Sequence, residues 1–186
     1  MMNMKEAQAA AWNSARDQLE ANGGITPMFA LHCHNDIVFL PATWGDEREK
    51  HAFVGLVRLY AVRWQPAVIT LITEAWVSKG LKQVRPAEDP ERQEVVMLMA
   101  FQPDGNQLVE SAPIVRDEGG TQLGDIESMP GVSTNTFMDM FGATLNADKA
   151  MILQAMPEGV FNDFVARIGF TMEHEQRMNL GDKWAH

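Results

Sequence analysis

The alternation of side chains over residues 68–116 is the feature that most constrains how this chain folds. From Val68 to Ser78 one set of alternate side chains is almost wholly apolar, and β-branched residues dominate, as strands prefer. From Glu94 to Gln102 both alternate sets are largely apolar, which is typical of a central strand covered on two faces. A Pro-Asp-Gly-Asn turn at 103–106 then leads into Leu108–Arg116. The block therefore predicts a three-stranded antiparallel meander.

The end of this meander carries signs of a sheet edge. Pro113 lies within the third predicted strand and has no N–H to donate, so we expect that strand to be an edge strand. Residues 119–135 are rich in Gly, Ser, Thr and Asp. This composition predicts an irregular or partly mobile segment.

A β-hairpin precedes the meander, and helices occupy the rest of the chain. Phe29–Cys33 and Ile37–Leu40 are predicted hairpin arms, because Asn35 and Asp36 are favoured turn residues between them. Periodicity and capping residues predict the helices. They span residues 4–21, 46–64, 136–145 and 147–156, with a final long helix from Pro157 that ends near Asn179-Leu180-Gly181.

The order of these elements predicts a single α+β domain over residues 1–186. Its antiparallel sheet should contain about five strands, namely the N-terminal hairpin and the three-strand meander. We expect the helices to pack mainly on one face of that sheet.

The charge is strongly acidic and unevenly distributed. The 186 residues carry a formal net charge of −10, and residues 104–148 hold eight acids against one base, Arg116. Such a field disfavours direct nucleic-acid binding, which needs Lys and Arg clusters. It favours solubility, cationic partners or metal ions.

Nothing in the sequence predicts a membrane or secreted protein. No apolar run approaches the ~18 residues of a membrane span, and the first 20 residues lack the apolar core of a secretory signal. Cys33 is the only cysteine, so an internal disulfide is excluded. We therefore expect a cytoplasmic protein.

The hairpin tip is the first candidate site. His32 and His34 are two residues apart and so share a strand face, where two imidazoles can ligate one metal ion with an oxygen from Asp36. A further ligand must come from elsewhere, with Glu74, His51 and the acids after Asp104 as candidates. The alternative is a pair of partly solvated histidines. Cys33 could act as a nucleophile beside a histidine, or simply as a small apolar side chain.

Glu74 is the second candidate site, because it interrupts an apolar strand. A carboxylate next to Trp76 can serve as a general acid. It can equally form a structural ion pair with Arg85 or Arg92. The polar loop from Gly80 to Gln93 is long enough to be functional, although a solvated connector is the alternative. The predicted binding residues at this end are Trp76, Arg85, Asp89, Glu91 and Arg92.

One block of sequence carries a resemblance. Glu74-Ala75-Trp76, followed by the sequence PAEDPERQE from Pro86 to Glu94, resembles a group of uncharacterised phage and prophage proteins. The resemblance implies a phage or prophage setting. That group has no established activity, so no catalytic residue is implied.

The absence of known catalytic signatures shapes the functional prediction. The sequence contains no Walker A motif, no G-x-G-x-x-G after a strand, no H-E-x-x-H and no G-x-S-x-G. Its 13 methionines suit core filling or an adaptable partner surface. We expect a small acidic interaction protein, without cofactor, that binds another protein and forms a homo-oligomer. In one form of this hypothesis residues 104–148 imitate the charge of a nucleic acid. The alternative is a hydrolase with a divalent metal held by His32, His34 and Glu74.

Overall fold

The chain folds into two compact units, each of which is described by itself. The computed structural model describes residues 2–42, 44–78, 89–130, 137, 139–142 and 146–168. The first unit comprises residues 1–43 and 66–135 and is called the sheet unit; the second comprises residues 44–65 and 136–186 and is called the helical unit. The single domain expected from the sequence stays a prediction.

An antiparallel sheet forms the first unit. Its strands follow the order β2-β1-β3-β4-β5-β6, and β7 pairs separately with β5. This arrangement confirms the predicted α+β class and adds two strands to the expected five. The strands are β1 (Met28–His32), β2 (Ile37–Pro41), β3 (Val68–Val77), β4 (Gln93–Phe101), β5 (Gln107–Asp117), β6 (Gly120–Leu123) and β7 (Glu127–Ser128).

The two added strands correct the predictions for Pro113 and for residues 119–135. β6 pairs with Ile114–Asp117 and β7 pairs with Glu110 and Ser111, so β5 is not an edge strand. Pro113 falls between these two pairings, and its carbonyl accepts from the Gly124 N–H at 2.8 Å. Because the N and C=O groups of one strand residue point to the same side, the missing N–H faces this gap. The proline therefore removes no hydrogen bond from the β4 ladder.

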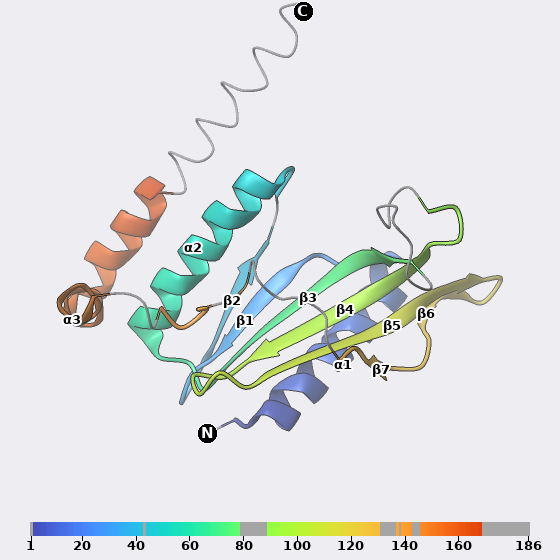
Figure 1. Ribbon diagram of the computed structural model, residues 1–186, viewed down its shortest axis with the longest axis horizontal. Coiled ribbons are helices and arrows are strands. Elements are labelled where there is room, and N and C mark those ends of the chain that lie inside the picture. Colours follow the sequence, from blue (N-terminus) through green and yellow to red (C-terminus); the bar gives the residue numbers. More distant parts are fainter. Residues whose placement is uncertain are drawn as a thin grey trace, which may run out of the picture. The chain divides into compact units, whose positions relative to one another are not determined.

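Helix α1 (Met4–Asn22) lies across one face of the sheet (Figure 1). It begins with a reciprocal capping box, in which Asn3 and Glu6 each accept from the other's backbone N–H. It ends at Gly23, whose φ of 69° is left-handed. Its apolar stripe packs with residues of β3, β4 and β5 into one core cluster. The buried members are Ala11, Trp12, Ala15, Leu19, Ile25, Ile72, Val96, Leu98 and Ala112.

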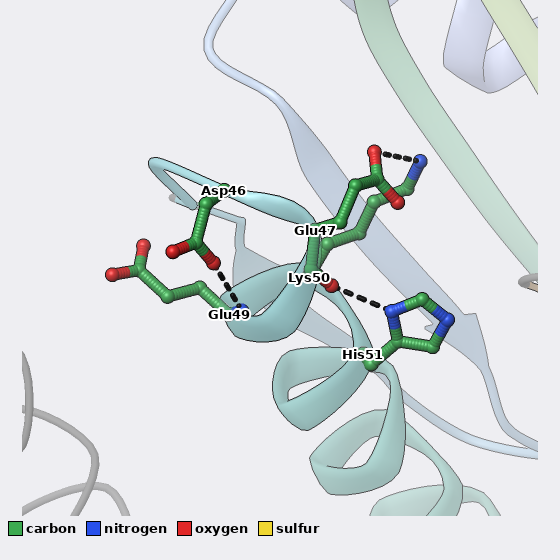
Figure 2. Close-up of polar contacts among 5 residues, drawn as sticks. All are labelled: Asp46, Glu47, Glu49, Lys50 and His51. Atoms are coloured by element: carbon green, nitrogen blue, oxygen red, sulfur yellow. Dashed lines mark hydrogen bonds and ion pairs between the residues drawn. The ribbon is translucent and has the colours of Figure 1, made fainter.

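Helix α2 (Glu47–Trp64) opens the helical unit with a dense set of polar contacts (Figure 2). The Asp46 carboxylate caps the helix by accepting from the Glu49 N–H at 2.8 Å. Lys50 and Glu47 form an ion pair at 3.5 Å, and a ring nitrogen of His51 bonds the Glu47 carbonyl oxygen. These acids lie where the helix dipole favours negative charge, so they fix the start of α2 that the sequence predicts.

Two further helical segments pack beside α2. Helix α3 (Ala147–Ala155) is capped by Asn146 as predicted, and residues 158–168 are helical as well. Figure 1 shows the latter segment running alongside α2. The rings of Tyr60 and Phe161 pack edge to face, with their centroids 5.3 Å apart. One buried cluster of this unit consists of Val62, Leu153, Phe161 and Val165.

The helix predicted over residues 136–145 is wrong for the residues that the structure describes there. Phe137 and Met140 are buried, as apolar side chains of a core should be. However, Asp139 and Gly142 have φ angles of 58° and 66°, and the backbone makes turns. Left-handed residues interrupt an α-helix, so these side chains reach the core from a folded loop.

Some predictions fall outside the described residues. They include residues 80–88 of the loop predicted from Gly80 to Gln93, and the part of the final helix beyond residue 168. Within the described part of the chain, no helix combines the length and the apolarity needed to cross a membrane.

Candidate functional site at the hairpin end of the sheet

A hollow opens where the β1–β2 hairpin meets the start of α1. Its volume is about 710 Å³. The hairpin itself forms as predicted, and the Cys33 N–H donates to the Asp36 carbonyl across the turn at 2.9 Å. The hollow is lined by Met2, Glu6, His32, Cys33, His34, Asn35, Asp36, Ile37 and Phe39. The structure thus brings the predicted hairpin-tip residues to the wall of one concave site.

A narrower pocket of about 100 Å³ shares three of these wall residues, His32, Ile37 and Phe39. It lies between α1 and the strands β1, β2 and β3, whereas α1 makes its densest contacts with β3, β4 and β6. Small side chains on the facing surfaces leave the space open. The remaining lining residues are Ala10, Ala11, Ser14, Met28, Ala30, Thr70 and Ile72.

His32 is the polar group at the centre of this site. Its side chain is 3% exposed, and Nε2 lies 3.2 Å from the Thr70 hydroxyl oxygen. Within the described residues, Nδ1 is buried and has no hydrogen-bond partner. Burial lowers the pKa of His32 below its usual value, which favours the neutral ring. A buried polar atom left unpaired costs about 1–3 kcal/mol, so a ligand that bonds Nδ1 would recover free energy here.

Cys33 does not have the surroundings of an activated nucleophile. Burial, and secondarily the Asp36 carboxylate, raise the pKa of its thiol. The Sγ atom lies 3.7 Å from the Leu31 carbonyl oxygen, the distance of a weak contact at most. Because the thiolate is the reactive form, a raised pKa disfavours nucleophilic chemistry.

The structure does not bring the expected metal ligands together. Glu74 shares the sheet face of His32, but His32 pairs with Val68, and Glu74 lies six residues further along β3. That separation is about 20 Å along the strand. Asp36 uses one carboxylate oxygen to accept from the Ile37 N–H at 2.8 Å. Among the described residues, no three His, Cys, Asp or Glu side chains are close enough to hold one ion.

Glu74 has a structural partner that the sequence did not suggest. Its carboxylate accepts from the Ile25 N–H at 2.6 Å and so ties the loop after α1 to β3. Arg92 lies over the ring of Trp76, with the guanidinium carbon 4.4 Å from the ring centroid. Arg85 lies outside the described residues.

The turn that carries Arg92 is anchored by a buried aspartate. Asp89 is 1% exposed, and one of its carboxylate oxygens accepts from the Glu91 N–H at 2.9 Å. Its carbonyl oxygen accepts from the Arg92 N–H at 3.1 Å. Trp76, Asp89, Glu91 and Arg92 therefore gather at one end of the sheet, and a binding role for them stays a prediction.

Glu110 is a buried acid that the sequence analysis missed. Its carboxylate lies beneath α1, where it accepts from the Trp12 indole N–H at 2.8 Å and from the Gln8 side-chain amide at 2.7 Å. The alternation of β5 places Glu110 on the same face as Leu108 and Ala112. An acid at an inward position of a strand was the signal that could have revealed it.

The helical unit exposes several large apolar side chains. On α3, Met151 and Ile152 are 63% and 62% exposed. On the segment 158–168, Val160 and Phe164 are 54% and 39% exposed. The same helices bury Leu153, Phe161 and Val165 on another face. The four exposed side chains therefore lie on the outer faces of well-formed helices.

Comparison with known proteins identified no relative of this chain. No family model, no curated protein and no solved structure matches the chain.

Proposed function

We propose that this protein acts by binding another protein molecule, and that it assembles with a second copy of itself through the helical unit. The observation that carries the proposal is the exposure of Met151, Ile152, Val160 and Phe164 on two consecutive helical segments. Single exposed apolar residues are normal on a protein surface. Four within residues 151–164 are a concentration of the kind that marks interaction sites.

The types of side chain support a protein partner. Met and Phe are enriched in the cores of protein interfaces, where charged residues are depleted. Met151 in particular is flexible and polarisable, so it can adapt to the surface of a partner. Buried methionines such as Met99 and Met140 fill the core instead. The buried methionines fit core filling, and the exposed Met151 supports the proposed partner surface.

The distribution of charge supports a second copy as the occupant. Counted along the sequence, the sheet unit holds 15 acids and 7 bases, a net charge of −8. The helical unit holds 10 acids and 8 bases, a net charge of −2. Two identical chains repel each other through their net charge, and the repulsion is weakest where the nearly neutral units meet.

A cytoplasmic location and a phage or prophage setting belong to the same proposal. The single cysteine fits a reducing compartment, where disulfides do not contribute to stability. The setting is supported by the resemblance of the Glu74–Glu94 block alone.

The proposal is tested by measuring the mass of the protein in solution. Light scattering after size exclusion should give twice the monomer mass at micromolar concentration. Ile152→Glu and Phe164→Glu should each shift the protein to the monomer, because the interface would bury an unpaired carboxylate. Val115→Glu, at an exposed apolar position of β5, is the matched control and should remain dimeric. A monomeric wild type, or a dimer that survives both helical substitutions, would refute the proposal.

A further inference from the structure

We propose that the pocket between α1 and the β1–β2 hairpin binds a short-chain alkylamine, with the alkyl chain inside the pocket and the amine beside His32. This site is separate from the proposed assembly surface, because its lining residues all belong to the sheet unit. The inference therefore stands or falls independently of self-association.

The pocket has the size and lining for an alkyl chain. Its volume of about 100 Å³ is smaller than the roughly 150 Å³ cavity that accommodates benzene. A chain of about four carbons therefore suits it better than an aromatic ring. Alanine and other apolar side chains from α1, β1, β2 and β3 form most of its wall. Phe39 is 55% exposed in the absence of a ligand, and an alkyl chain would cover part of its ring.

His32 supplies the hydrogen-bonding group at the junction of the pocket and the hollow. Its Nδ1 atom is buried and, among the described residues, unpartnered. When Nε2–H donates to the Thr70 hydroxyl oxygen, Nδ1 is an acceptor. An ammonium group carries only donors, so it complements this tautomer. Because Nδ1 is closed off from solvent, binding requires a small rotation of the imidazole ring toward the hollow.

The charges around the hollow select the sign of the head group. Glu6 and Asp36 line it, and none of its described lining residues is Lys or Arg. Carboxylates attract a cationic head group and repel an anionic one. His34 also lines the hollow and adds a ring that can donate or accept a hydrogen bond. An amine should therefore bind more tightly than an alcohol of the same length, and a carboxylate should bind least.

The test is a methyl NMR titration of the full chain with three probes of equal chain length: n-butylamine, n-butanol and butyrate. The amine should give saturable shifts at the Ala30 and Ile72 methyl groups, with a dissociation constant in the millimolar range expected for so few atoms. Butyrate should bind at least tenfold more weakly than the amine.

A pair of matched variants separates the pocket from nonspecific binding. Ala10→Leu adds a larger side chain to the pocket from an exposed position of α1, so the fold should persist. Amine affinity should fall at least tenfold. Ala21→Leu, the same change at an exposed position near the end of α1, should bind like the wild type. Equal binding of the two variants, equal affinity for the three probes, or shifts absent from Ala30 and Ile72 would overturn the proposal.

Discussion

At the scale of single residues, the Glu110 carboxylate is the polar group on which the α1–sheet contact most depends. It is 8% exposed, and it receives hydrogen bonds from two side chains of α1. Bonds to a charged group are worth more than bonds between neutral groups. Removing the acid would also leave the Trp12 N–H buried without an acceptor.

We predict that Glu110→Ala lowers the free energy of unfolding by about 1.5–3 kcal/mol, the range for lost hydrogen bonds to a charged group. Urea denaturation followed by Trp fluorescence measures this loss. Glu118→Ala removes an exposed acid in the turn after β5 and should change stability by less than about 0.5 kcal/mol. Equal effects of the two substitutions would contradict the structural role of Glu110.

His32 should make the stability of the protein depend on pH. Burial lowers its pKa in the folded state, so the unfolded chain binds a proton at a higher pH than the folded chain does. Acid therefore favours unfolding. The groups that face the hollow with it are Glu6 of α1 and Cys33, His34 and Asp36 of the hairpin. Burial is the cause of the lowered pKa of His32.

We predict that wild-type stability falls as pH drops below about 6.5, the ordinary histidine value, with a slope of at most about 1.4 kcal/mol per pH unit from one proton. His32→Gln should lose that part of the slope between pH 7 and pH 5. His51→Gln replaces an exposed histidine and provides the comparison. A His32→Gln slope equal to that of the wild type would show that His32 does not contribute.

At the scale of elements, α1 and α2 end in the same left-handed geometry with different residues. Gly23 closes α1 with φ 69°, and Gln65 closes α2 with φ 47°. A side chain in this conformation costs about 1–2 kcal/mol, whereas glycine adopts it freely. A Cβ at position 23 would lie 3.8 Å from the Thr121 hydroxyl, an ordinary contact, so backbone strain is the main cost there.

We predict opposite signs for two exchanges at these ends. Gly23→Ala should destabilise the protein by about 1 kcal/mol, and Gln65→Gly should stabilise it by about 0.5–1 kcal/mol. Thermal unfolding of the two variants measures both changes. Two shifts in the same direction would mean that contacts other than backbone conformation decide these positions.

The elements that the sequence predicts well are those with strong periodicity or clear caps. α1, α2 and the β3–β5 meander lie within a residue or two of the predicted bounds. β6 was missed because Gly120–Leu123 contains only one large apolar residue, Leu123, and so shows no alternation of its own. The composition of residues 119–135 predicted an irregular segment, whereas pairing with the free side of β5 makes Gly120–Leu123 a strand.

The candidate site was predictable in part. The hairpin alternation located His32 and His34, but the inner pocket depends on how α1 packs over β1, β2 and β3. That packing joins segments far apart in the sequence. The distance between His32 and Glu74 likewise depends on the β1–β3 register, which alternation does not fix.

At the scale of the whole molecule, the net charge is unevenly divided between the two units. Most of the net charge belongs to the sheet unit, where Asp104, Asp117, Glu118, Asp125 and Glu127 are exposed. The exposed apolar helices belong to the nearly neutral helical unit. The imitation of nucleic-acid charge by residues 104–148 stays a prediction. Residues 104–135 of this segment belong to the sheet unit and carry six of its eight acids, so a basic partner would contact mainly the sheet unit.

The most direct test of the central claim is a filtered NMR experiment on mixed samples, in which one half of the chains carries labelled methyl groups. The account predicts intermolecular NOEs to the methyl groups of Met151 and Ile152. Intermolecular NOEs confined to the sheet unit, or none at concentrations where the wild type is dimeric by mass, would contradict assembly through the helical unit.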